Sequence, residues 1–211
     1  LDSLIQRGII KIYDEIKSVG HRFVQGGTAY ASSVVIDEKV VAKVEELIPL
    51  APIHNPANLI CYKAFKEVLP NVDGVAVFDT AFHQTMAPED YVYPIPYELT
   101  EKYQIRRYGF HGTSHKFLAQ ESYRYLEGVK EPKVISCHIG SGASLAAIKN
   151  GKCVATSMGL SPLGGIMMGT RTGDMDPSVF SYVCQVTGKS MDEVYAMFNK
   201  KSGFLGVSGI S

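Results

Sequence analysis

The sequence lacks a net charge and lacks any long uninterrupted apolar run. Lys and Arg together number 21, and so do Asp and Glu. No net field therefore draws the chain to nucleic acid or to an anionic membrane surface. No apolar run approaches the roughly 20 residues that a membrane-spanning helix needs. We expect neither a nucleic-acid partner nor a membrane segment, and a 45% hydrophobic share of 211 residues is enough for a packed core.

The cysteines lack the spacing of a metal or redox motif. Cys61, Cys137, Cys153 and Cys184 lie in apolar surroundings, and no two of them form a C-x-x-C pair. We interpret them as reduced core residues of a cytoplasmic protein, since disulfide frameworks belong to oxidising compartments.

Familiar nucleotide-binding and hydrolase motifs are missing too. No G-x-x-x-x-G-K-[ST] loop and no G-x-S-x-G elbow occurs, and GSGASL (140–145) lacks the last glycine of G-x-G-x-x-G. His111 and His115 have the spacing of a zinc helix, but Gly112 stands where H-E-x-x-H has its glutamate. The sequence argues against P-loop, Rossmann, serine-hydrolase and zinc sites, and we predict no metal ligand within these residues.

Hydrophobic periodicity predicts an α/β fold. Isoleucines at helical spacing predict a helix over 2–17, and strands are predicted at 19–24 and 74–79. Asp37 predicts one helix start, and Asn55, as the cap before Pro56, predicts another.

The second half continues the alternation after an irregular stretch, 81–107, which is the candidate domain junction. A helix is predicted from His111 to about Leu126, and three strands over 133–159 with a hairpin turn at Asn150-Gly151. The segment SMDE (190–193) predicts a capping box that starts a further helix.

Two stretches concentrate polar groups among glycines. RRYGFHGTSH (106–115) contains two histidines, and SPLGGIMMGTRTGDMDP (161–177) contains Arg171. Glycine lets a ligand approach the backbone, and the arginine fork suits phosphate or carboxylate. The alternatives are a plain β-meander corner at 140–142 and an Arg171–Asp174 pair in a surface turn. Arg106 and Arg107 are expected to be solvated.

Seven stretches together resemble the successive signatures of the acetate kinases and the similar propionate kinases. They are GHRFVQGG, PLAPIHNPAN, VFDTAFH, YGFHGTSH, CHIGSGASLAAIKNGK, TSMGLSPLGGIMMGTRTGDMDP and SGFLGVSGIS. The resemblance implies the two-domain acetate and sugar kinase/actin-like ATPase fold, with 1–80 ending the first domain and 81–211 beginning the second, nucleotide-binding domain. It also implies reversible Mg²⁺-dependent phosphoryl transfer from ATP to acetate, giving acetyl phosphate and ADP.

The resemblance also implies roles for individual residues. Asp79, His111 and Arg171 match catalytic positions, and Arg22 and His54 match positions that bind the carboxylate or the phosphate. Positions that bind the ATP phosphates are matched by His138, Ile139, Gly140, Ser141 and Gly142. Positions that form the apolar pocket for the substrate methyl group are matched by Val24, Ile53, Phe110 and Pro162.

Further expectations concern what the chain does not match. The family's N-terminal metal and phosphate loop and its C-terminal adenosine-binding and metal-binding segments have no counterpart here. We therefore expect an internal segment of a longer protein, with Mg²⁺ ligands elsewhere and no activity of its own. A homodimer is implied by the resemblance. A propionate kinase and a non-catalytic actin-like module remain alternatives, and Ser141 replaces the family's usual asparagine.

Overall fold

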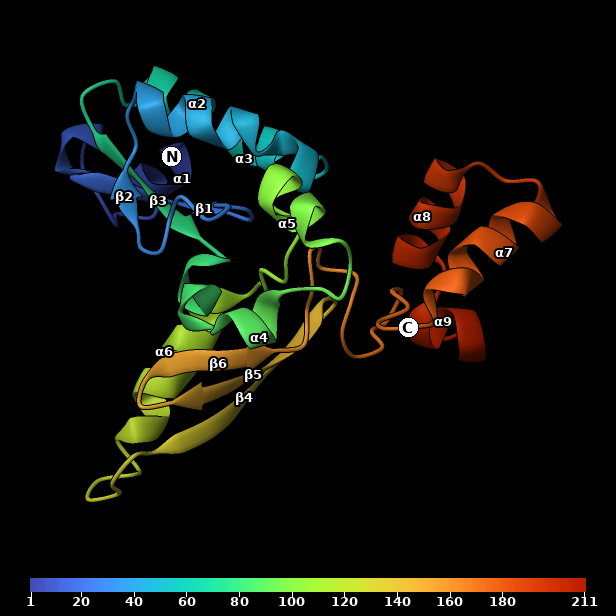
Figure 1. The fold of residues 1–211 in the computed structure, drawn as a ribbon. Helices are drawn as coiled ribbons and strands as arrows, with labels where there is room; N and C mark the ends of the chain where they lie inside the picture. Colours follow the sequence, from blue (N-terminus) through green and yellow to red (C-terminus); the bar gives the residue numbers. More distant parts are fainter. The chain divides into compact units, whose positions relative to one another are not determined.

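The computed structural model describes residues 1–211, which form two compact units, 1–81 and 82–211 (Figure 1). Each unit combines a three-stranded sheet with helices. The α/β class predicted from the sequence is confirmed.

Unit 1 is built on a sheet with the strand order β1-β3-β2. Its elements are α1 (Asp2–Gln6), β1 (Ser18–Phe23), β2 (Val34–Val35), α2 (Glu38–Glu46), α3 (Asn55–Val68) and β3 (Asp73–Phe78). β1 runs parallel to β3 and β2 runs antiparallel to it. Phe23, Val44, Leu59 and Phe78 belong to a core cluster that joins the sheet to α2 and α3. Asp37 caps α2 as predicted, accepting a hydrogen bond from the Val40 amide at 2.8 Å.

Two predictions in unit 1 are wrong. The helix expected over 2–17 is limited to Asp2–Gln6, followed by a 3₁₀ turn at Tyr13–Glu15. Ile9 and Ile12 are 58% and 57% exposed, so they have no core to pack against, and Gly8 leaves the helix with a φ of +68°. His54, not Asn55, occupies the N-cap position of α3, and it does so without a side-chain capping hydrogen bond; Asn55 is the first residue of the helix.

Unit 2 contains an antiparallel sheet with the order β4-β5-β6, which is the strand–turn–strand–turn–strand pattern predicted. Its elements are α4 (Pro88–Tyr91), α5 (Tyr97–Tyr103), α6 (Gly112–Tyr123), β4 (Lys133–Ile139), β5 (Ala143–Lys149), β6 (Lys152–Thr156), α7 (Pro177–Thr187), α8 (Met191–Lys200) and α9 (Gly203–Ser208). Asn150 and Gly151 have φ values of +52° and +77°, as a tight hairpin turn requires.

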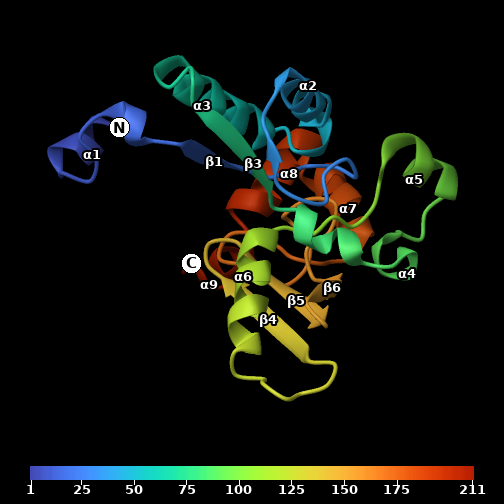
Figure 2. The same cartoon turned by 90° about the vertical axis from the view of Figure 1, so that its left-hand side faces the viewer.

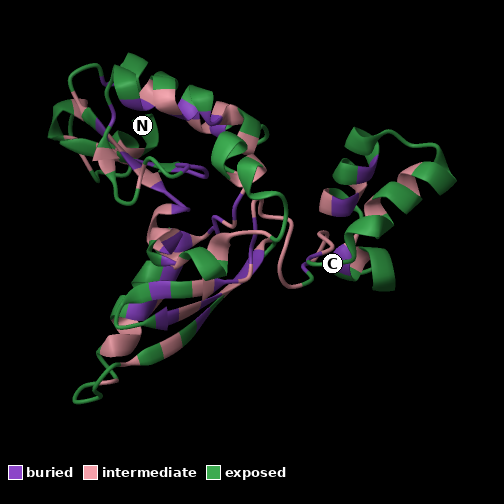
Figure 3. Ribbon diagram, in the orientation of Figure 1, coloured by how far each residue is buried: buried purple, intermediate pink, exposed green.

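Helix α6 packs against β4 (Figure 2). Buried residues alternate with more accessible ones along β5 and β6, and β4 contains one buried residue, Ser136 (Figure 3). The core beneath α6 includes Ala119, Ala146, Ile148 and Cys153. This packing fixes the first turn of α6 beside the β4–β5 corner.

The helix signals near the C-terminus are confirmed. Asp176 caps α7, and Ser190 and Glu193 form the predicted capping box of α8. No helix is long and apolar enough to cross a lipid bilayer. All four cysteines are free, but Cys61 and Cys137 are exposed, so the prediction that they belong to the core is wrong. Cys137 lies at an outward position of β4, next to the buried Ser136.

Candidate active site

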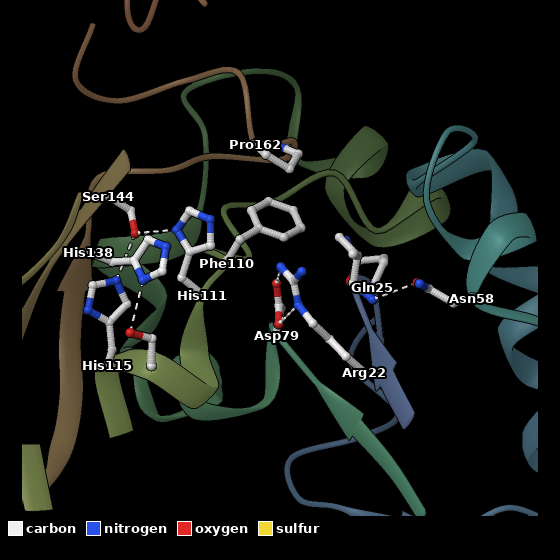
Figure 4. A network of polar contacts seen from close by, with 12 residues as sticks. Arg22, Gln25, Asn58, Asp79, Phe110, His111, His115, His138, Ser144 and Pro162 are labelled. Carbon is white, nitrogen blue, oxygen red and sulfur yellow. Dashed lines mark hydrogen bonds and ion pairs between the residues drawn. The ribbon is translucent and has the colours of Figure 1, made fainter. Parts of the chain in front are cut away.

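In unit 1, Arg22 and Asp79 form a two-pronged ion pair (Figure 4). Arg22 Nε and Nη2 donate to the two carboxylate oxygens of Asp79 at 2.9 and 2.6 Å. The pair forms because β1 and β3 are parallel neighbours in which Arg22 lies opposite Val77, so the residue after β3 is within reach. The Asp79 side chain is 2% exposed and that of Arg22 is 63% exposed. Hydrogen bonding to Asp79 raises the pKa of Arg22.

The loop after β1 is tied to α3 by two asparagines. The Val24 amide donates to Asn58 Oδ1 at 3.1 Å (Figure 4), and Asn55 exchanges hydrogen bonds with the Gln25 backbone at 3.2 and 3.1 Å. Asn55 therefore serves as a loop anchor, which explains why its side chain does not cap the helix. His54 lies directly before α3, Val24 is buried, and Ile53 is 60% exposed.

In unit 2, His111 occupies an unusual backbone conformation at the start of α6. Its φ is +57°, a left-handed value that non-glycine residues seldom adopt. The preceding Gly109 has a φ of +71°, and a Cβ there would lie 2.5 Å from Thr156 Cγ2 and 2.8 Å from His83 Cδ2. His83 Nε2 lies 2.8 Å from the Phe110 carbonyl oxygen. The backbone of residues 109–111 is thus closely packed, and its conformation directs the His111 ring toward Ser144 and Gly142.

The ring of His111 belongs to a hydrogen-bonded chain of buried groups. His111 Nδ1 and His115 Nε2 each lie 2.8 Å from Ser144 Oγ (Figure 4), and His115 Nδ1 lies 2.6 Å from Ser136 Oγ. Ser144 and His115 are fully buried. Burial, reinforced by three neighbouring histidines, lowers the pKa of His115 to about 3, so this imidazole is neutral at physiological pH.

His138 lies next to this chain at the end of β4. Its ring stacks on that of His111 with 4.0 Å between centroids, and its Nδ1 lies 2.9 Å from Ser114 Oγ. The turn that follows, Gly140–Gly142, joins β4 to β5 and leaves Gly140 and Ser141 exposed. Exposed backbone amides in such a turn suit the oxygens of a phosphate.

Gly142 is the point where His111 and Arg171 converge. A Cβ added to Gly142 would lie 3.1 Å from Arg171 Nη1 and 3.3 Å from both Cε1 and Nε2 of His111. The absence of a side chain at Gly142 therefore lets Arg171 and His111 approach the same point of the backbone closely. Two hydrogen-bond donors beside bare backbone form a cradle suited to an anionic group.

Arg171 is half-buried and has no carboxylate partner. Its Nη1 donates to the Pro162 carbonyl at 3.1 Å, whereas Asp174 accepts from the Gly165 amide at 2.7 Å. The alternative of an Arg171–Asp174 surface pair is wrong. Burial lowers the pKa of Arg171, since desolvation penalises the charged form. No carboxylate in the described residues therefore balances the guanidinium charge.

The prediction that Arg106 and Arg107 are solvated is wrong. Arg106 is 8% exposed and stacks over the Tyr91 ring at 3.6 Å. Arg107 Nη1 donates to three carbonyls, those of Thr156, Ser157 and Met158, at 3.0–3.2 Å. Both arginines are structural, because aromatic rings and carbonyl oxygens take the place of water around them.

The sequence model of the acetokinase family matches residues 1–211, the whole of this chain. The chain belongs to the acetokinase family. The acetate kinase of Geobacillus sp. (strain WCH70) is 53% identical over 212 residues, which cover 100% of this chain and 53% of that protein. The chain thus spans about half the length of the curated relatives it matches.

Two solved structures support the same family. The crystal structure of Porphyromonas gingivalis acetate kinase matches with a TM-score of 0.91 and 49% identity over 99% of this chain and 53% of that one. A propionate kinase from Francisella tularensis subsp. tularensis SCHU S4 matches with a TM-score of 0.93 and 44% identity over the same shares. The predicted fold, that of the acetate kinases, is confirmed for this acetokinase segment.

Within the acetokinase segment, the sequence-predicted residues fall into both units. Unit 1 contains Arg22, Val24, Ile53, His54 and Asp79. Unit 2 contains Phe110, His111, His138, Ile139, Gly140, Ser141, Gly142, Pro162 and Arg171. The structure brings Arg22 to Asp79, and His111 and Arg171 to Gly142. Sequence analysis assigned no role to His83, His115 or Ser144. The only available signal was that each lies within one of the seven stretches that resemble the family. Contacts between separate strands and helices cannot be recognised from the spacing of residues in the sequence.

Clusters of metal-ligating side chains bear on whether the described residues could hold an ion. No group of three or more His, Cys, Asp or Glu side chains could hold a metal ion. Both oxygens of Asp79 already accept from Arg22, which leaves this carboxylate poorly suited as a ligand.

Proposed function

We propose that this chain is part of an acetate kinase, which transfers a phosphoryl group reversibly between ATP and acetate and so forms acetyl phosphate and ADP. One observation carries the proposal beyond family membership. Arg171, a guanidinium without a carboxylate partner, and His111 approach the same point of the backbone at Gly142. The two side chains could therefore donate hydrogen bonds to the same phosphoryl group.

His111 and Arg171 would stabilise the transition state. In-line phosphoryl transfer spreads negative charge over the three equatorial oxygens of the moving group. The protein then contributes mainly position and fixed donors. Arg171 offers a rigid fork of N–H groups, and His111 Nε2 lies as close to the Gly142 point as does its Cε1.

The turn after β4 would hold the phosphates of ATP. Its members are His138, Ile139, Gly140, Ser141 and Gly142. Ser141 is exposed, whereas the Gly140 amide donates to the Gly142 carbonyl at 3.1 Å within the turn. Ser141 also offers a shorter side chain than the asparagine usual in the family. Nucleotide affinity would therefore rest on backbone donors and the His138 ring.

Unit 1 would supply the groups that bind the charged end of the substrate. Arg22 and His54 would bind the carboxylate or the transferring phosphate. Val24 and Ile53 of unit 1 and Phe110 and Pro162 of unit 2 would be the residues that contact the methyl group. Acetate has a pKa of roughly 4 and is ionised at neutral pH, so it needs no general base. Asp79 would orient Arg22, to which it is bound through both oxygens, or the water shell of the metal.

Other features follow from the family and remain part of the proposal. Residues 1–80 would end the first kinase domain, and 81–211 would begin the nucleotide-binding domain. Mg²⁺ would be held by residues outside this chain, so the isolated 211 residues would be inactive. The protein would act as a cytoplasmic homodimer.

The test uses the full-length protein that contains these residues. Mg²⁺, ATP and acetate are supplied with hydroxylamine, which traps an acyl phosphate as a hydroxamate. We expect acetate-dependent hydroxamate that Arg171→Ala abolishes. Arg124→Ala is the matched control, because Arg124 pairs with Glu121 on the surface of α6. No hydroxamate from the unaltered protein would refute the proposal.

Propionate is the second candidate substrate. A solved propionate kinase shares 44% identity with this chain. One methylene in a pocket changes binding by only about 1–3 kcal/mol, so a single pocket residue decides little. Propionate run beside acetate in the same assay distinguishes the two, and a higher kcat/KM for propionate would change the substrate without changing the site.

A further inference from the structure

Four buried or half-buried groups form a continuous hydrogen-bonded chain that ends at the proposed transition-state residue. Ser136 Oγ contacts His115 Nδ1, His115 Nε2 contacts Ser144 Oγ, and Ser144 Oγ contacts His111 Nδ1. Ser136 is 5% exposed, and His115 and Ser144 are 0% exposed. Residues on β4, β5 and α6 therefore determine the hydrogen bonding of His111 Nδ1.

The protons in this chain can be ordered in two ways. Ser144 has one hydroxyl proton, and it can donate that proton either to His111 or to His115. His115 is neutral, since burial lowers its pKa to about 3, so only one of its nitrogens carries a proton. The choice at Ser144 thus fixes the tautomers of both histidines.

Only one order uses every buried proton. If Ser144 donates to His115, then His115 Nδ1 donates to Ser136, and the Ser136 hydroxyl proton has no acceptor. If Ser144 donates to His111, then His115 Nε2 donates to Ser144 and Ser136 donates to His115, so all three protons are used. Buried donors are rarely left unpaired, because an unmade hydrogen bond there costs about 1–3 kcal/mol.

We propose that Ser144 is a positioning residue that holds His111 in the tautomer with its proton on Nε2. The Nε2 atom lies 3.3 Å from the Cβ point of Gly142, beside Arg171 Nη1 at 3.1 Å. His111 can then donate to a phosphoryl oxygen while uncharged. A cationic His111 would have to donate from Nδ1 to Ser144, which reverses the whole chain and leaves Ser136 unpaired.

This inference rests on the proposed function for its catalytic consequence, but the tautomer can be measured without any substrate. The first measurement is the ¹⁵N NMR spectrum of the imidazoles in the full-length protein at neutral pH. We expect a protonated Nε2 and an unprotonated, hydrogen-bonded Nδ1 in His111, and the same protonation pattern in His115. A proton on Nδ1 of His111 in the unaltered protein would overturn the proposal.

The second measurement uses Ser144→Ala. We expect His111 to populate both tautomers and kcat to fall roughly 10- to 100-fold, with KM for the acid changed far less. A merely structural role would lower the melting temperature without moving the His111 nitrogen shifts. Unchanged His111 shifts together with an unchanged kcat would contradict the assignment.

Ser122→Ala is the matched control. Ser122 lies on α6, and its hydroxyl bonds only to the Ala119 carbonyl, so it should alter neither the His111 shifts nor kcat. The two proposals fail separately: absence of hydroxamate would refute the kinase activity, whereas the nitrogen shifts alone decide the tautomer.

Discussion

Two candidate site residues, Arg22 in unit 1 and Arg171 in unit 2, are held in opposite ways. Arg22 is 63% exposed, yet its charge is matched by two hydrogen bonds to the buried Asp79. Arg171 is half-buried, but it donates to a backbone carbonyl and has no ion pair. An exposed arginine is thus neutralised and a half-buried one is not.

The difference shows where the fold reserves positive charge. A carboxylate partner fixes the direction of Arg22, which suits a group that positions a substrate. Arg171, by contrast, has no ion pair and lies with His111 beside Gly142. Donors without an internal anion are what a developing negative charge needs.

The largest effect is expected from Arg171→Lys. Lysine keeps the charge but loses the fixed fork, so the comparison predicts a fall in kcat of roughly 10³-fold in the hydroxamate assay. The melting temperature should change little, because no ion pair is lost. Activity close to that of the unaltered protein would show that charge alone suffices at Gly142.

A smaller loss is expected from Asp79→Asn in unit 1. The amide keeps the shape but removes the charge that directs Arg22, and charge-assisted hydrogen bonds contribute about 1.5–3 kcal/mol. We expect kcat/KM for the acid to fall roughly 10- to 100-fold. Asp73→Asn at the exposed start of β3 is the control. If Asp79→Asn retained most activity, the charge would not be what orients Arg22.

Gly142→Ala tests the close approach of Arg171 and His111 at Gly142 directly. It should lower kcat/KM for ATP about 10-fold. The added Cβ would lie 3.1 Å from Arg171 Nη1 and 3.3 Å from His111 Nε2, so both groups must shift by a few tenths of an ångström. Gly20→Ala is the matched control, since nothing lies within 4 Å of its Cβ point. Equal activity of the two variants would remove Gly142 from the site.

The last effect concerns stability in acid, where the change within any one pH unit is small. The unfolded chain protonates His115 near pH 6.5, whereas the folded protein resists protonation until about pH 3. Between these values the unfolded state binds the extra proton, so the free energy of unfolding falls as the pH falls, by up to about 1.4 kcal/mol per pH unit from this group. Urea unfolding at several pH values across this range measures the free energy of unfolding. That free energy should fall less steeply with falling pH in His115→Gln than in the unaltered protein. Equal slopes would mean that His115 is not held neutral.

Local signals in the sequence predicted much of the fold. The Asn150-Gly151 turn, the Asp37 cap and the Ser190–Glu193 capping box depend on neighbours only a few residues away, and each is confirmed. The prediction of a helix over 2–17 was wrong because it depended on packing and not on neighbouring residues alone. Its isoleucines had the right spacing, but helices of this length depend on a surface to pack against.

Contacts between distant segments escaped prediction. Arg106 and Arg107 looked like surface cations, but Tyr91 and three carbonyls of residues 156–158 surround them. Ser144 and Ser136 are ordinary strand residues until β4 and β5 pair and α6 packs beside them.

The sequence by itself determined the family, the α/β class and the identity of the charged candidate site residues. Motifs and hydrophobic periodicity involve residues that are close together in the chain, so they can be recognised without the structure. Only the tertiary structure decided which arginine is neutralised and which way a histidine proton points. Those properties depend on atoms brought within 3 Å by strand pairing and on burial that excludes water. Neither is encoded in the spacing of residues along the chain.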